Sequence, residues 1–196
     1  MSDPPFRCFG GSDPLYGAYH DEEWGRPVTD ERALLERICL EGFQSGLSWL
    51  TILRKRDNFR AAFAGFDPEA LSRFGDADVE RLLGDAGIIR HRGKIEATLA
   101  NGRATAELHA GGGTLRELLW SHAPGAGRRP AGDLGGVPAE TPESKALSKE
   151  LKKRGFRFVG PTTAYSAMQA CGVVNDHLAQ CPVRAAVEAE QRAARA

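Results

Sequence analysis

Residues 85–94 have the sequence DAGIIRHRGK, which forms a glycine-containing turn between two helical patterns. Before this turn, Asp76 can cap a helix that Gly84 ends. After it, Ile95 and Leu99 begin a second run of apolar residues at helical spacing. The turn and its two flanking helices therefore predict a helix-hairpin-helix.

Helical patterns also extend along the chain on both sides of this hairpin. Asp30 can cap a helix over residues 31–41, which Gly42 interrupts, and an amphipathic helical pattern follows over residues 45–63. Further helix starts are marked by Pro68, Pro142 and Pro161, and residues 12–14 indicate either a turn or a helix start. Because the period-two alternation of a strand persists nowhere, the sequence predicts an all-α fold.

The length of the chain predicts a single domain over residues 1–196. With 196 residues, of which 41% are hydrophobic, the chain can bury one core of ordinary size. Residues 121–142 are rich in glycine and proline and predict a long exposed loop. The tail over residues 183–196 is rich in alanine and charge, and we expect either a frayed helix or a disordered segment.

Charge and cysteine content exclude several classes of protein. The 26 basic residues balance the 26 acidic ones, so no global field attracts nucleic acid or a membrane surface. The chain has neither a signal-peptide pattern nor an apolar run of membrane-spanning length, and four cysteines are too few for a secreted disulfide scaffold. We therefore expect a cytoplasmic protein without a membrane partner, in which Cys39 and Cys171 pack in the core.

The other two cysteines lie near opposite ends of the chain, each with a histidine nearby. Cys8 and His20 lie near the N-terminus, whereas His177 and Cys181 have the i, i+4 spacing that places two side chains on one helical face. Four such donors are enough for a closed tetrahedral zinc site. The spacing alone also fits two unrelated pairs, or unpaired surface thiols.

Two short segments concentrate aromatic and acidic residues. Residues 16–25, YGAYHDEEWG, hold three large aromatic side chains among charges, and residues 41–49, EGFQSGLSW, place Glu41 between apolar helical patterns. The aromatic residues alone could equally belong to the core, and Glu41 could lie at a solvated helix end.

Five segments together indicate a family. They are DPLYGAYHDEEWG (13–25), LEGFQSGLSWLTILRKR (40–56), DAGIIRHRGKI (85–95), LSKELKKRGFRFVGPTT (147–163) and MQACGVVNDH (168–177). In this order they resemble the constitutive bacterial 3-methyladenine-DNA glycosylases, and the resemblance extends from about residue 8 to residue 181. Two features depart from the family pattern: the interval from Cys8 to His20 is one residue shorter, and Phe9 replaces a tryptophan found in some members.

The resemblance implies a base-excision repair enzyme with the fold of the helix-hairpin-helix DNA glycosylase superfamily. Such an enzyme flips 3-methyladenine out of alkylated double-stranded DNA and hydrolyses its N-glycosidic bond, without a lyase step. One structural zinc ion would join the N- and C-terminal segments through Cys8, His20, His177 and Cys181. The residues implied to line the base pocket are Tyr16, Tyr19, Trp24, Glu41 and Trp49. We expect a monomer.

The chemistry of the lesion agrees with these residues. In DNA, 3-methyladenine is a cation, which an electron-rich aromatic face attracts more strongly than it attracts neutral adenine. Glu41 can accept hydrogen bonds from the base, and the charged purine leaves without prior protonation. No aspartate lies between Asp85 and Asp133, where most relatives in the superfamily have a catalytic one, and the constitutive family shares this absence.

The hairpin supplies candidate contacts to the DNA backbone. Gly87 can bring backbone N–H groups close to a phosphate, and Arg90, Arg92 and Lys94 add positive charge. A second basic cluster is Lys152, Lys153, Arg154 and Arg157. We expect Leu47 to fill the gap left by the flipped base. Charged runs of this kind are also common on ordinary solvated helix surfaces.

Two alternatives remain at this stage. A non-catalytic, zinc-stabilised DNA-binding module would keep the hairpin and the metal ligands but would not need Glu41 beside Trp49. A glycosylase for another lesion, such as 3-methylguanine or a bulky alkyl adduct, would keep the whole pattern, with Phe9 altering the pocket.

Overall fold

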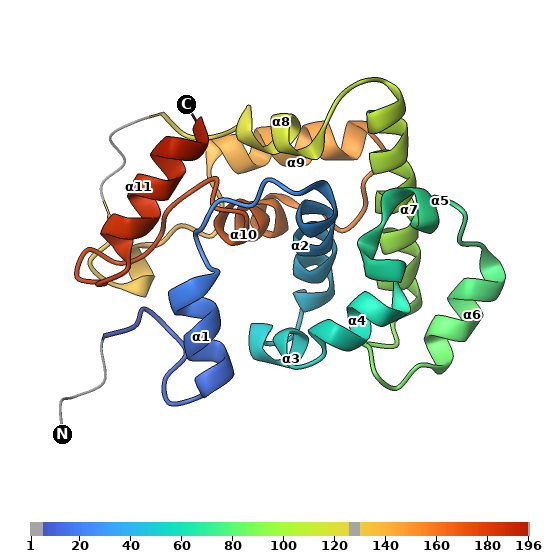
Figure 1. Ribbon diagram of the computed structural model, residues 1–196, viewed down its shortest axis with the longest axis horizontal. Coiled ribbons are helices and arrows are strands. Elements are labelled where there is room, and N and C mark those ends of the chain that lie inside the picture. Colours follow the sequence, from blue (N-terminus) through green and yellow to red (C-terminus); the bar gives the residue numbers. More distant parts are fainter. Residues whose placement is uncertain (1–5, 126–129, 196) are drawn as a thin grey trace.

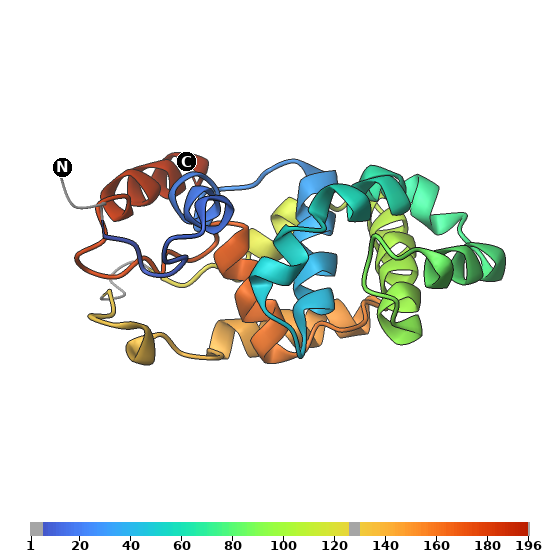
Figure 2. The same cartoon turned by 90° about the horizontal axis from the view of Figure 1, so that it is seen from below.

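The computed structural model describes residues 6–125 and 130–195, and across these ranges it contains helices and loops but no strand. The all-α prediction is therefore confirmed. Figures 1 and 2 show helix α1 (Pro14–Glu22) and the C-terminal helix α11 (Arg184–Arg195) at one end of the molecule, and α6 (Asp76–Gly84) at the other. The N-terminal and C-terminal helices thus lie at the same end of the molecule. No helix among the described residues is long and apolar enough to cross a membrane.

Helix α2 (Glu31–Gln44) lies in the centre of the fold and packs against α3 (Trp49–Leu53), α7 (Arg92–Ala110), α8 (Leu115–Trp120) and α10 (Pro161–Ala170). The Asp30 side chain caps it by accepting a 2.9 Å hydrogen bond from the backbone N–H of Ala33. The prediction that Gly42 interrupts this helix is wrong, because α2 continues to Gln44. A Cβ atom at Gly42 would lie 3.3 Å from Cβ of Phe158, so this glycine permits close packing inside the helix.

The segment predicted as one helix over residues 45–63 forms two helices, α3 (Trp49–Leu53) and α4 (Arg56–Ala62). The chain changes direction at Lys55, whose φ and ψ angles of −104° and 2° lie outside the helical region. The Lys55 ammonium donates to the carbonyl oxygens of Ala86 and Gly87, at 3.0 and 3.2 Å. These two hydrogen bonds therefore connect the α3–α4 segment to the hairpin.

The predicted helix-hairpin-helix is confirmed: α6 and α7 (Arg92–Ala110) flank the turn over residues 85–91. His91 caps α7, because its Nδ1 accepts a 3.2 Å hydrogen bond from the backbone N–H of Lys94. The short helix α5 (Pro68–Ser72) packs on α7 at Gly102, where a Cβ atom would lie only 2.4 Å from Cβ of Leu71. This contact therefore requires glycine.

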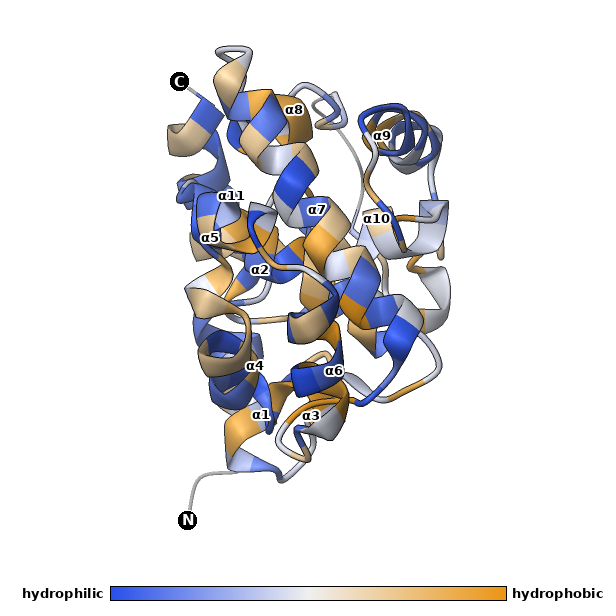
Figure 3. Cartoon of the chain, turned by 90° about the vertical axis from the view of Figure 1, so that its right-hand side faces the viewer, coloured by the Kyte–Doolittle hydropathy of each residue, from blue (hydrophilic) through white to orange (hydrophobic). Residues whose placement is uncertain are grey.

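The second half of the chain contains α8 (Leu115–Trp120), α9 (Pro142–Lys153) and α10 (Pro161–Ala170). Figure 3 shows that α9 is mostly hydrophilic, and it buries mainly a stripe that includes Leu147 and Leu151. The segment predicted as a long loop contains a short 3-10 helix, η2 (Leu134–Gly136), while its residues 126–129 lie outside the described residues.

The C-terminal tail forms a helix, which is one of the two alternatives that the sequence left open. Val187 and Gln191 of α11 are buried, and the side-chain amide of Gln191 donates a 2.8 Å hydrogen bond to the carbonyl oxygen of Gly25. Helix α11 therefore packs beside the N-terminal segment.

Candidate metal centre and adjoining pocket

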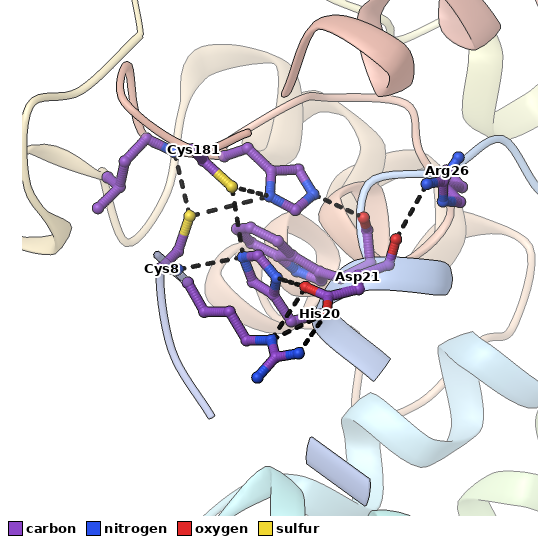
Figure 4. A network of polar contacts seen from close by, with 9 residues as sticks. Cys8, His20, Asp21, Arg26 and Cys181 are labelled. Carbon is purple, nitrogen blue, oxygen red and sulfur yellow. Dashed lines mark hydrogen bonds and ion pairs between the residues drawn. The ribbon is translucent and has the colours of Figure 1, made fainter. Parts of the chain in front are cut away.

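Two cysteine sulfurs and two histidine nitrogens meet where the chain ends come together (Figure 4). The potential ligand atoms of Cys8, His20, His177 and Cys181 lie within 4.8 Å of one another, and all four residues are buried. Cys181 Sγ lies 3.3 Å from His177 Nδ1 and 3.6 Å from His20 Nε2. Cys8 Sγ lies 3.8 Å from His177 Nδ1. Neighbouring S and N ligands of a tetrahedral zinc ion are about 3.6 Å apart, so the four side chains fit such a site.

The second nitrogen of each histidine has a partner that orients the ring. His20 Nδ1 lies 2.7 Å from a carboxylate oxygen of Asp21, which also binds Arg7. His177 Nε2 donates a 2.9 Å hydrogen bond to the carbonyl oxygen of Trp24. Both rings therefore direct an unprotonated nitrogen towards the sulfurs, as metal-binding histidines do.

Burial favours uncharged side chains in this cluster. It raises the pKa of the Cys8 thiol to about 11 and lowers the pKa of His177 to about 4. A neutral imidazole is the form that binds a metal, whereas a buried thiolate requires a nearby cation. The donor set is therefore suited to a divalent metal ion.

A cavity of about 220 Å³ lies beside the metal cluster. Its size is below the roughly 300–1,000 Å³ of pockets for drug-sized ligands, and it suits one small planar molecule. The sequence predicted five of its lining residues: Tyr16, Tyr19, Trp24, Glu41 and Trp49. Phe9 also lines it, as its expected effect on the pocket required, and the structure adds Gln44, Leu134, Val137, Ser166 and Gln169. Four segments far apart in the sequence, residues 9–24, 41–49, 134–137 and 166–169, therefore build one pocket.

Aromatic rings in mutual contact form much of the pocket wall. Phe9 lies between Tyr16 and Trp24, with ring centroids 4.9 and 4.8 Å away, and Tyr19 lies 5.2 Å from Trp49. These contacts hold the rings in place and leave aromatic faces available to a planar ligand. The indole Nε1 of Trp49 is buried and has no hydrogen-bond partner in the described part of the chain.

Glu41 is the acidic group of this pocket. Only 6% of the residue is exposed, and none of the described residues donates a hydrogen bond to its carboxylate. Burial raises the pKa of Glu41 to about 8, although the nearby positive charge of Arg37 acts in the opposite direction. A buried acceptor without a donor is costly, so this carboxylate favours a ligand that brings positive charge or N–H donors.

The hairpin residues predicted to contact DNA occupy three different environments. Arg90 is exposed in the turn, whereas Arg92 is exposed but paired with Glu80 at 2.6 Å. The backbone N–H of Gly87 donates to the side chain of Asp85 at 2.7 Å, which fixes the turn. Lys94 is described below. Arg90 is thus an exposed cation at the hairpin.

Leu47 projects from the turn between α2 and α3. This side chain is 41% exposed and follows Gly46, whose φ angle of 80° is the left-handed conformation that glycine adopts readily. The second basic cluster lies at the C-terminal end of α9 and just beyond it and is also exposed, with Arg154 bound to Glu150 at 2.9 Å.

Lys94 does not lie on the surface with Arg90. Its ammonium group donates to the carbonyl oxygens of Phe43 and Ser45, at 2.9 and 2.5 Å, and only 8% of the residue is exposed. These carbonyls belong to the end of α2, where a positive charge is favourable. A phosphate contact by Lys94 therefore does not fit this position. The sequence gives no clear signal of this burial, because Lys94 follows Arg90 and Arg92 in a basic stretch.

We expect the Lys94→Met variant to lose about 1–3 kcal/mol of unfolding free energy, because the carbonyl groups of Phe43 and Ser45, the first of them buried, lose their donor while the aliphatic stem is retained. Urea denaturation would measure the change. The matched control is Arg90→Met, which should stay within about 0.5 kcal/mol of the wild type. Equal stability of Lys94→Met and the wild type would contradict this role.

Comparisons with known proteins support one family. A family model described as methyladenine glycosylase matches residues 9–185. The chain is 54% identical to DNA-3-methyladenine glycosylase 1 of Escherichia coli K12, over 89% of this chain and 95% of that protein. It is 45% identical to a DNA-3-methyladenine glycosylase of Haemophilus influenzae, over 91% and 97% of the two chains.

Solved structures show the same similarity. A crystal structure of a 3-methyladenine DNA glycosylase I superposes with a TM-score of 0.87 at 52% identity, covering 90% of this chain and 98% of that one. The enzyme of Staphylococcus aureus, whose structure was described as the basis of 3-methyladenine recognition, gives a TM-score of 0.85 at 35% identity, covering 90% and 95% of the two chains.

Proposed function

The chain belongs to the methyladenine glycosylase family, and from this premise we propose that it acts as a monomer that excises 3-methyladenine from alkylated double-stranded DNA. The observation that supports this function best is the pocket, in which a buried carboxylate without a donor lies among aromatic rings. The direct test is to identify the bases that the purified protein releases from methylated DNA.

Recognition rests on charge and hydrogen bonding. The extruded base enters the cavity and stacks on Trp49, whose electron-rich face attracts a cation. Glu41 accepts hydrogen bonds from the base, and the cationic purine stabilises the charged form of this carboxylate, whereas neutral adenine does not. The rings of Tyr16, Tyr19 and Trp24 complete the wall.

Hydrolysis needs little further chemistry from the protein. When the bond between the sugar carbon and the base nitrogen breaks, its electron pair neutralises the positive charge of the purine. A water oxygen forms the new bond to the sugar carbon and loses a proton to solvent, which leaves an abasic site and neutral 3-methyladenine. None of the described residues lining the cavity is a lysine. A Schiff base with the sugar is therefore not expected, and neither is a lyase step.

The metal of the buried Cys2His2 cluster is proposed to be zinc, one ion per chain. Two thiolates and two imidazoles in a tetrahedral arrangement are the ligands that zinc prefers in structural sites. The four protein ligands leave no position for water or substrate. We therefore assign the ion a structural role, in which it joins the segment that begins at Cys8 to the segment that ends at Cys181.

Binding to the DNA backbone is proposed to involve the hairpin around Gly87, with Arg90 as its exposed cation and Arg92 beside it. Leu47 is positioned on an exposed turn between two pocket-lining helices, which is suitable for filling the space of the extruded base.

The Arg90→Glu variant should bind damaged and undamaged duplexes about tenfold more weakly at low salt, because a phosphate contact adds affinity without reading the base. The dependence of log K on log salt should also become shallower by about one. Fluorescence anisotropy on both duplexes over a salt series would measure both effects. The control is Arg192→Glu on α11, at the opposite end of the fold. A loss of affinity confined to the damaged duplex would place Arg90 in the pocket instead.

A further inference from the structure

The glycine- and proline-rich segment before α9 forms part of the pocket, although its sequence indicates only an exposed loop. Leu134 and Val137, at the two ends of η2, line the same cavity as Glu41 and Trp49. Leu134 is also 50% exposed, which leaves apolar surface beside the cavity that a ligand could cover. The Leu134 side chain therefore faces both the cavity and the solvent.

Hydrogen bonds hold this segment in place. The Asp133 side chain caps η2 by accepting a 3.0 Å hydrogen bond from the backbone N–H of Gly136. The carbonyl oxygen of Ala131 accepts from the backbone N–H of Ala179 at 2.9 Å, and that of Gly132 accepts from the side chain of Gln180 at 3.2 Å. Both donors lie between the potential metal ligands His177 and Cys181 in the sequence. The segment is thus a fixed wall attached to the metal-binding part of the chain.

We propose that Leu134 and Val137 form an apolar lip that covers the extruded base and determines how tightly the pocket holds it. This inference rests on the proposed function, because the occupant is the base itself. The base would bury the exposed surface of Leu134, which is favourable in proportion to the apolar area removed from water. The lip would also exclude water, and so strengthen the attraction between the cationic base and the Glu41 carboxylate.

The test compares Leu134→Ala, and the double variant with Val137→Ala, with the wild type. Binding of free 3-methyladenine would be measured through the fluorescence of the pocket tryptophans, and base release from methylated DNA under single-turnover conditions. We expect about three- to tenfold weaker base binding for the single variant, a larger loss for the double variant, and slower release in both. The matched control is Leu15→Ala, because this leucine of α1 is 41% exposed and is not among the residues lining the cavity.

Affinity for undamaged duplex should stay at the wild-type value in these variants. Unchanged base binding and release would overturn the proposal. Weaker binding to undamaged duplex with unchanged binding of the free base would also overturn it, since Leu134 would then contact the DNA strand. Failure of the wild type to release 3-methyladenine is a separate result, which would contradict the proposed function rather than the lip.

Discussion

The Glu41→Gln variant is expected to release 3-methyladenine about ten- to a hundredfold more slowly than the wild type. The substitution nearly preserves the shape of the side chain, but it removes the negative charge and replaces one acceptor with a donor. In a pocket that excludes water, hydrogen bonds to a charged group contribute on the order of 1–3 kcal/mol, which corresponds to this range of rates. Single-turnover assays on methylated DNA would measure the effect, with undamaged-duplex affinity unchanged.

A matched control lies on the same helix. Glu36 is also buried, but its carboxylate binds Arg60 through two hydrogen bonds of 2.8 Å and is not among the residues lining the cavity. The Glu36→Gln variant should therefore keep the wild-type rate of release even if its stability falls. Wild-type rates for Glu41→Gln, or equal losses in both variants, would contradict the assignment of Glu41 to the base.

The stability of the free protein supplies a second readout of the Glu41 variant. The folded state raises the pKa of Glu41 to about 8, from about 4.5 in the unfolded chain. Between these values the folded state binds more protons than the unfolded state, so this group makes the free energy of unfolding decrease as pH rises from about 4.5 to about 8. Relative to wild type, Glu41→Gln should therefore gain stability over this interval. Thermal unfolding at several pH values would show the trend, and a constant difference would contradict it.

Removing two metal ligands is expected to have the largest effect on stability. The Cys8→Ala/Cys181→Ala double variant should lose its metal, and its Tm should fall by about 10 °C or more, because metal binding contributes directly to folding. Metal analysis of the purified protein would give a stoichiometry near one for the wild type and near zero for the variant.

The chain offers a control for the loss of two buried thiols. Cys39 and Cys171 are as buried as the cluster cysteines but lie outside the cluster. The Cys39→Ala/Cys171→Ala variant should keep one metal ion per chain, so any loss of stability would come from packing alone. Full metal content in the Cys8→Ala/Cys181→Ala variant would contradict the proposed ligand set.

The sequence predicted the helical architecture because its signals are local. Asp30 caps α2 and Pro142 begins α9, as their positions before or at the start of apolar periodicity indicated. The prediction that Gly42 interrupts α2 was wrong because the local signal is ambiguous. A glycine can end a helix or permit close packing within it, and only the position of Phe158 distinguishes the two.

Some residues of the candidate site could be predicted from the sequence, whereas others were missed or misplaced. Glu41 and Trp49 belong to a family motif, and the structure brings both to one cavity. Leu134 and Val137 were missed because nothing in a glycine-rich loop indicates which distant element it will contact. Lys94 was placed on the surface because its neighbours are basic, whereas its ammonium group binds the end of α2. Tertiary contacts between distant segments decide both cases.

The most direct test of 3-methyladenine excision by this pocket is chromatography of the bases that the metal-bound wild-type protein releases from methylated duplex DNA. We expect strong release of 3-methyladenine and little release of 7-methylguanine. Release of no alkylated base would contradict the enzymatic function and favour a zinc-stabilised DNA-binding module. Release of another alkylated base in preference to 3-methyladenine would contradict the proposed substrate.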